Sequence, residues 1–221
     1  MRLLFISFLL IPFLGFSQKQ FEFDYQITYQ NINYKDSITI IEHYLTNSRD
    51  NSYYGIVRSI DSIRSEFQFD EHDGHHFKVY FKTAELPTAE FLNIECQYVR
   101  YYKNPYKKRI NDYHFIKLTD TLMNDELSSH YTLVSNLDPK KRKRKKVGRN
   151  DYVIDNSTTF HLPILTHPTA YEEWKIEGNL PAGVFKEKTF INFKGEIEQK
   201  IKLVGLKRIN KTVRLPKDCS Y

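Results

Sequence analysis

Three histidines and an aspartate lie close together at residues 72–76, in the order His-Asp-Gly-His-His. Imidazole and carboxylate groups are common zinc ligands, and a zinc site holds three or four of them on a rigid frame. Asp73 and Gly74, however, are typical of a tight turn between two strands. His75 and His76 would then be neighbours in an extended strand, with side chains on opposite faces, so they cannot easily share one ion. The pattern favours a polar hairpin tip over a metal site.

A second pair of histidines, His161 and His167, flanks a short proline-containing segment. No His-Glu-x-x-His helix, Cys-x-x-Cys pair or third spaced ligand accompanies them. The sequence also lacks a Gly-x-Ser-x-Gly nucleophile turn and a glycine-rich phosphate loop. The adjacent acids Glu172 and Glu173 are typical of a solvated edge, with side chains on alternate faces. We therefore assign no catalytic or metal-binding residue and expect no cofactor. A hydrolase whose site is assembled from separate strands stays open as an alternative.

Residues 138–150 contain seven consecutive basic side chains. Like charges at this density repel one another, so the stretch predicts an exposed, flexible loop between two strands. Such a loop fits a polyanion, for example acidic lipid headgroups or an anionic polysaccharide. Sequence-specific nucleic-acid binding is not expected, because the run contains no aromatic residue on which bases would stack. The whole chain carries a formal charge of +6, so the remainder is close to neutral. The candidate contact residues are Lys140, Lys141, Arg142, Lys143, Arg144, Lys145 and Lys146.

The chain has two cysteines, Cys96 and Cys219. An even number in an exported chain allows a disulfide. Closing so long a loop is worth about 5 kcal/mol in the chain-entropy model, from which strain subtracts. Two unpaired cysteines are the alternative, because Cys219 lies near the end of the chain, where segments are often loosely held.

Residues 1–17 have the three parts of a secretory signal peptide: the charged Arg2, a short apolar run, and the small residues Gly15 and Ser17 before a cleavage site. The apolar run is shorter than the roughly 20 residues that span a bilayer, although an uncleaved anchor is the alternative. We expect an exported protein with a single β-rich domain over 18–221, located in the periplasm, on the outer cell surface or outside the cell. No later segment is apolar enough to span a membrane. Export argues against a nuclear role for the basic run.

The elements that would position these side chains are mostly strands. In the segment Gln-Phe-Glu-Phe-Asp-Tyr-Gln-Ile-Thr-Tyr, apolar and polar residues alternate over nine positions. A period of two indicates a strand with one buried face, since a helix would scatter the aromatic residues around its girth. The residues on the expected buried face are Phe21, Phe23, Tyr25, Ile27 and Tyr29.

Strand patterns recur along the rest of the chain. Pro87 is expected to open a short helix within 85–95, because its missing N–H is harmless at the first helical position. Prolines 163 and 168 limit regular pairing in their segment, and 172–178 reads as a short strand or a helical turn. Further strands are expected at 37–46, 52–60, 96–104, 112–120 and 130–136, in a hairpin that turns at Asp73-Gly74, in a hairpin that turns at Lys194-Gly195, and in a last strand that ends at Pro216.

These segments alternate with no regular series of helices, which favours a mainly β fold with antiparallel pairing. We expect a large curved antiparallel sheet with one to three short helices. A sheet with so many strands tends to curl, close or split into layers, so a half-barrel, a barrel and a sandwich all fit.

Three features carry a family resemblance: the Phe-Ser-Gln at 16–18, the aromatic strand at 21–29, and the closing segment at 190–216. In these the chain resembles small secreted proteins of Bacteroidetes-type bacteria. The closing hairpin is also similar to that of half-barrel periplasmic lipoprotein carriers, in which a curved sheet shelters acyl chains. The resemblance covers the first strand and the last third of the chain, and no ligand residue can be carried across.

The resemblance implies a binding module at the cell envelope. The surplus of Phe and Tyr on alternating strands suggests an apolar or amphipathic ligand, such as a lipid, although the same residues would also fill a closed core. The two alternatives from other classes are the hydrolase mentioned above and a structural envelope protein without a small ligand.

Overall fold

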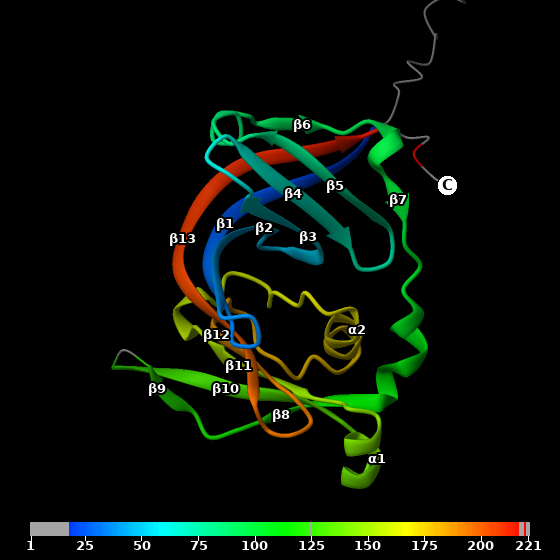
Figure 1. The fold of residues 1–221 in the computed structure, drawn as a ribbon, viewed down its shortest axis with the longest axis vertical. Helices are drawn as coiled ribbons and strands as arrows, with labels where there is room; N and C mark the ends of the chain where they lie inside the picture. The colour runs from blue at the N-terminus through cyan, green and yellow to red at the C-terminus, as the bar shows by residue number, and fades with distance from the viewer. Residues whose placement is uncertain (1–17, 124, 217–218, 220–221) are drawn as a thin grey trace, which may run out of the picture.

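The computed structural model describes residues 18–123, 125–216 and 219; the expected signal peptide lies outside this range. Within it, one curved sheet contains thirteen strands and resembles an open half-barrel (Figure 1). The main path of the sheet runs β7-β5-β4-β3-β2-β1-β13-β12-β11-β10-β8, while β6 pairs with β13 and β9 with β10. The β6–β13 pair is parallel, whereas the other described pairs are antiparallel. The expected fold class is confirmed.

The bounds of the strands are β1 (Lys19–Asn33), β2 (Ile38–Asn47), β3 (Asp50–Ser59), β4 (Arg64–Glu71), β5 (His75–Lys82), β6 (Phe91–Asn93), β7 (Arg100–Tyr101), β8 (Tyr113–Lys117), β9 (Thr121–Met123), β10 (Glu126–Ser135), β11 (Arg149–Ile154), β12 (Phe185–Ile191) and β13 (Ile197–Leu215). The helices are α1 (Pro139–Arg144) and α2 (Pro168–Glu177), with short 3-10 helices η1 (Cys96–Tyr98), η2 (Pro105–Asp112) and η3 (Asn156–Thr158).

The sheet bends where its two longest strands pair. β1 and β13 run together along most of their length, but the register shifts between Phe23 and Tyr25 and again between Thr28 and Tyr29. Such bulges bend the strands and increase their twist. The alternating residues from Phe21 to Tyr29 are all buried, as their spacing predicts.

Strands β2 and β3 are covered on both faces. Neighbouring side chains of a strand point to opposite faces, yet Tyr44 belongs to one buried cluster and Leu45 to the other. The same holds for Ile56 and Val57 in β3. Gly55, also in β3, leaves room for the ring of Phe67 on the neighbouring strand, because an added Cβ would clash with that ring. Two cores therefore share these strands, which explains the uninterrupted buried runs at 44–46 in β2 and 53–57 in β3.

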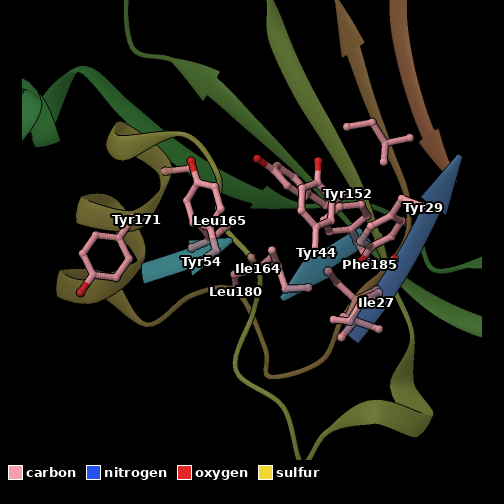
Figure 2. Close-up of a cluster of buried hydrophobic side chains, with 14 of the residues drawn as sticks. Ile27, Tyr29, Tyr44, Tyr54, Tyr152, Ile164, Leu165, Tyr171, Leu180 and Phe185 are labelled. Atoms are coloured by element: carbon pink, nitrogen blue, oxygen red, sulfur yellow. Dashed lines mark hydrogen bonds between the residues drawn. The ribbon is translucent and has the colours of Figure 1, made fainter. Parts of the chain in front are cut away.

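The first core lies inside the curve of the sheet. Figure 2 shows its side chains, which come from β1, β2 and β3, from β11 and β12, and from the segment that leads through α2. Tyr29 stacks on Phe185 with ring centroids 4.4 Å apart, so strands that are not neighbours in the sheet meet here. We call this side the concave face; the chain's own residues 160–184 fill much of it (Figure 1).

Helix α2 closes the concave face through two buried acids. It begins at Pro168, which needs no hydrogen-bond partner at that position, and ends at Gly178 in the left-handed region. The side chain of Glu172 accepts a hydrogen bond from Asn104, and that of Glu173 accepts one from the backbone N–H of Phe115. The expectation of solvated acids was wrong, because a helix directs both carboxylates toward neighbouring elements.

Several predicted elements differ in the structure. The second arm of the hairpin at Lys194-Gly195 and the predicted last strand form one strand, β13. Gly74 turns its hairpin without a positive φ, and an added Cβ would meet the Glu71 carboxylate, which would have to shift. Pro87 begins no helix, and residues 83–88 form turns that lead to β6. The predicted strand 96–104 contains η1 and only the two-residue β7.

Candidate functional site

An apolar pocket lies where the edges of β5 and β6 approach each other. Strand β5 pairs with β7 only at His75 and His76, so its later residues have no strand partner on that edge within the described chain. The pocket there has a volume of about 420 Å³. We call it the seam pocket; its lining residues are Phe67, Val79, Tyr80, Phe81, Glu85, Leu86, Ala89, Phe91, Leu92, Asn93, Ile94, Glu95 and Tyr98.

The inner wall of the seam pocket is rigid aromatic core. Phe67 is buried and packs edge-on against Phe77, with ring centroids 5.7 Å apart. Phe77 in turn stacks on Phe69 at 5.0 Å. Val79 and Phe81 continue the same face of β5 and are only partly buried, since they face the pocket. The alternation of these residues in the sequence is typical of a strand with one buried face.

The outer wall is held in place by the ammonium group of Lys211. It donates hydrogen bonds to the backbone carbonyls of Leu86 at 2.5 Å and Ala89 at 2.6 Å. Burial lowers the pKa of this ammonium group. The backbone adds two bonds, from the N–H of Thr212 to Glu90 and from that of Ile94 to Arg214. A loop that sequence reasoning predicted as a helix is thus tied to β13 by a buried lysine, a contact with no local signal.

Exposed aromatic rings surround the mouth of the pocket. Tyr80 is 62% exposed, Phe91 47% and Tyr98 50%. The guanidinium of Arg214 lies over the ring of Phe91, 3.6 Å from its centroid, which fixes that ring by a cation–π contact. Large apolar groups at a pocket mouth are typical of a surface that meets a ligand or partner.

The concave face also carries a chain of polar side chains, which we call the polar belt. Hydrogen bonds and ion pairs connect six side chains, one from each of six neighbouring strands, in the order Gln199, Asn31, Glu42, Arg58, Glu66 and Lys78. Glu42 is buried and lies 2.6 Å from Arg58, which satisfies its charge. The belt joins β13 to β5 and shows that this face is built from polar as well as apolar groups.

The histidines of the predicted hairpin tip separate in the structure. His72 is 4% exposed and packs inside the fold, and burial lowers its pKa to about 4. His75 contacts the Glu71 carboxylate at 2.9 Å instead. His161 is also buried, at 1% exposed, and burial lowers its pKa, whereas His167 is exposed. No group of three or more metal-binding side chains forms within the described residues. The polar-tip prediction was wrong for His72, because Tyr171 of α2 stacks on its ring.

The basic run connects β10 and β11 and is largely exposed, with a short helix at its start. Asp138 caps α1 by accepting a hydrogen bond from the backbone N–H of Lys141, and Pro139 occupies the first turn. Cations in the last turn also face the negative end of the helix dipole. These local interactions offset the repulsion between like charges, so part of the predicted flexible loop forms a helix. The run lies at the opposite end of the molecule from β6 (Figure 1).

Cys96 and Cys219 form a disulfide. The bond joins Cys96, which lies between the pocket-lining residues Glu95 and Tyr98, to the segment after β13. Among the described residues, no helix has the length and apolar character to cross a membrane.

Comparison with known proteins finds only weak structural similarity. No family model matches the chain, and no curated protein matches it. Similar solved structures include an uncharacterized conserved protein from Thermus thermophilus, at 8% identity and a TM-score of 0.46, with 85% of this chain and 80% of that one covered. In the MucA/MucB complex of Pseudomonas aeruginosa the identity is 8% and the TM-score 0.46, with 85% of this chain and 52% of the other covered, so this chain spans about half of that one.

A putative outer membrane lipoprotein-sorting protein domain from Vibrio parahaemolyticus is also similar, at 10% identity and a TM-score of 0.30, with 84% and 85% of the two chains covered. Nothing in the comparisons bears on the resemblance to small secreted Bacteroidetes-type proteins. At these values the likenesses assign no function to the chain.

Proposed function

We propose that the protein is an exported, non-catalytic binding module whose seam pocket takes one apolar or amphipathic chain, such as that of a lipid. The observation that carries this proposal is the pocket of about 420 Å³ with its mainly apolar lining. Pockets for small ligands commonly measure about 300 to 1,000 Å³ and combine an apolar lining with a few polar groups. Glu85, Asn93 and Glu95 supply the polar groups here.

The position of the pocket supports an amphipathic ligand in particular. Its inner wall is core and its mouth carries exposed rings, so an apolar tail inserts between Phe67 and Leu92 while a polar end stays in solvent. Burying the tail contributes about 25 cal/mol for each Å² of apolar surface removed from water. The lining contains no histidine, which favours binding over the hydrolase alternative at this pocket.

A substitution that fills the seam pocket tests the proposal. Ala89→Trp places a large ring in the lining, and Val204→Trp is the matched control because Val204 is 61% exposed on β13 and outside the lining. A solvatochromic naphthylamine dye should brighten with wild type and with V204W, but not with A89W. Fatty acid should displace the dye. Equal dye binding by A89W would contradict the proposal.

Native mass spectrometry of protein purified from its own host gives a second readout. The expected result is a fraction of molecules that carry one lipid-sized adduct, with none on A89W. Wild type without any adduct, together with no dye binding, would favour the structural envelope protein.

A further inference from the structure

Lys188 points into the concave face from the middle of β12. Its neighbours across the sheet are Tyr152 in β11 and Ile201 in β13, and both are buried members of the core. Cross-strand partners share a face, so the lysine stem lies among core side chains. Its ammonium group lies 5.7 Å from the centroid of the Tyr152 ring. Burial lowers the pKa of Lys188 to about 8.

No carboxylate pairs with Lys188 within the described chain. Its ammonium group donates one side-chain hydrogen bond, to the Thr166 hydroxyl at 3.1 Å. Glu42 is the acid that acts on it through space, but that carboxylate already binds Arg58 at 2.6 Å and Asn31 at 3.0 Å. By contrast, Lys200 on the neighbouring strand pairs with a glutamate at 2.8 Å. Inward-facing lysines without a counter-charge are rare because an unpaired ammonium group loses hydration on burial.

Two further features favour an anion at this place. Thr166 lies just before α2, so Lys188 is next to the N-terminal end of the helix, where the dipole repels cations and attracts anions. The Tyr152 hydroxyl is fully buried and forms no hydrogen bond with the described residues. Lys188 thus lies beside the N-terminal end of a helix and near the ring of Tyr152, whose hydroxyl has no partner, and no carboxylate is bonded to its ammonium group among the described residues.

We propose that Lys188, with the hydroxyls of Thr166 and Tyr152, binds one anionic group, a carboxylate or a phosphate, on the concave face. The anion would neutralise the ammonium group and accept hydrogen bonds from it and from Tyr152. Thr166 keeps its hydroxyl proton for the anion because its oxygen accepts from Lys188. Charge-assisted bonds of this type are about twice as strong as neutral ones.

This site is separate from the seam pocket, since Tyr152 belongs to the first core and none of Lys188, Thr166 and Tyr152 lines the pocket. The anionic group has two sources, a free small anion or the headgroup of an amphiphile. Acetate, inorganic phosphate and decanoate distinguish them. Binding of the small anions indicates a small-molecule site, whereas binding of decanoate with neither small anion indicates a headgroup.

The experiment measures the melting temperature of wild type against concentration of each probe, with sodium chloride at matched ionic strength as the baseline. We expect a saturable rise with at least one probe. Lys188→Met should weaken binding about tenfold or more, because it removes the charged donor. Tyr152→Phe should weaken it several-fold. Lys200→Met is the matched control and should bind as wild type does.

Two outcomes would overturn the proposal: no saturable rise with any of the three probes, or equal binding by K188M and wild type. Circular dichroism of K188M separates loss of binding from loss of folding. Decanoate binding should also be compared in A89W, which blocks the seam pocket. Decanoate binding that A89W abolishes and K188M preserves belongs to the seam pocket and counts against Lys188 as a headgroup site.

Discussion

The imidazole ring of His72 stacks on the phenol ring of Tyr171, with centroids 4.1 Å apart and planes inclined by 15°. His72 directly follows β4, and Tyr171 lies in α2, so this contact attaches the helix to the β4–β5 hairpin. The Nε2 atom of His72 is buried and forms no hydrogen bond with the described residues. A proton added there would have no acceptor.

Acid should therefore weaken the fold through His72. Its pKa of about 4 in the folded state lies below the ordinary 6.5, so the unfolded chain takes up the proton first. The contribution of neutral His72 to the free energy of unfolding is fully present above about pH 6.5. It is lost as the pH drops toward 4, and the loss is about 2 to 3 kcal/mol at most. His161 and His167 act in the same direction. Urea unfolding at pH 7.0 and pH 4.5 measures the loss.

His72→Phe keeps the stacking and removes the titrating group. We expect the difference in unfolding free energy between the two pH values to shrink by roughly 1 to 3 kcal/mol in this variant. His130→Gln, at a half-exposed strand position, is the control and should behave as wild type does. An unchanged difference in H72F would show that other groups cause the acid loss.

The charge of Lys188 should cost stability. Its pKa of about 8 lies below the ordinary 10.5, so the folded state disfavours the ammonium form. The penalty is present below about pH 8 and is relieved as the pH rises toward 10.5, because the folded protein then loses its proton before the unfolded chain does. Lys188→Met should raise the free energy of unfolding at pH 7 by on the order of 1 to 3 kcal/mol, and this advantage should shrink by pH 10.

Guanidinium unfolding at pH 7 and pH 10 tests the prediction, with K200M as the control that loses an ion pair instead. Lower stability of K188M at pH 7 would mean that the ammonium group contributes more through contacts than it costs. A stability gain, combined with lost anion binding, would identify a residue that serves binding at the expense of the fold.

The Cys96–Cys219 disulfide should stabilise both the fold and the outer wall of the seam pocket. The two residues are 123 positions apart, and bonds that close long loops restrict the unfolded chain most. Replacing both cysteines by serine should lower the free energy of unfolding by about 2 to 4 kcal/mol and weaken dye binding. Dithiothreitol should destabilise wild type to the level of the variant. Two free thiols in native, unreduced protein would contradict the bond.

Much of the fold followed from local patterns, whereas the sites did not. The alternation in β1 and the hairpin at Gly195, whose φ is +88°, are encoded within a few residues of themselves. The inward direction of Lys188 depends on its register with Tyr152, which lies 36 positions earlier by sequence number. Likewise, Lys211 holds the loop at Leu86 through the pairing of strands from opposite ends of the chain. Such contacts have no signal in any short window.

The failures have a common physical cause. Sequence reasoning assumes that each strand has one buried face and one solvent-exposed face. His72 is buried, although it was expected at an exposed turn, and Leu45 is buried on the opposite face from its buried neighbour Tyr44. Glu172 illustrates the same point for α2, because its buried carboxylate accepts a hydrogen bond from the distant Asn104. Tertiary coverage determined each of these environments.

The basic run should contribute to surface binding but little to stability. Six of its seven side chains are exposed and Arg142 is half-buried, and α1 buries no residue. Replacing Lys140–Lys146 with a Gly/Ser linker should leave the melting temperature nearly unchanged, since few contacts are lost and repulsion is relieved. Retention on heparin or on anionic vesicles at low salt should disappear, because the cations that displace counterions are gone.

A matched variant separates charge from helix structure. Pro139→Gly weakens the start of α1 but keeps all seven cations, so it should be retained on heparin as wild type is, with the same steep dependence on salt. Loss of retention in P139G would mean that the helical arrangement of the cations is required. Unfolding of the linker variant would show that α1 is a packed element after all, and persistent retention would place the polyanion surface elsewhere, on a remainder of the chain that is close to neutral.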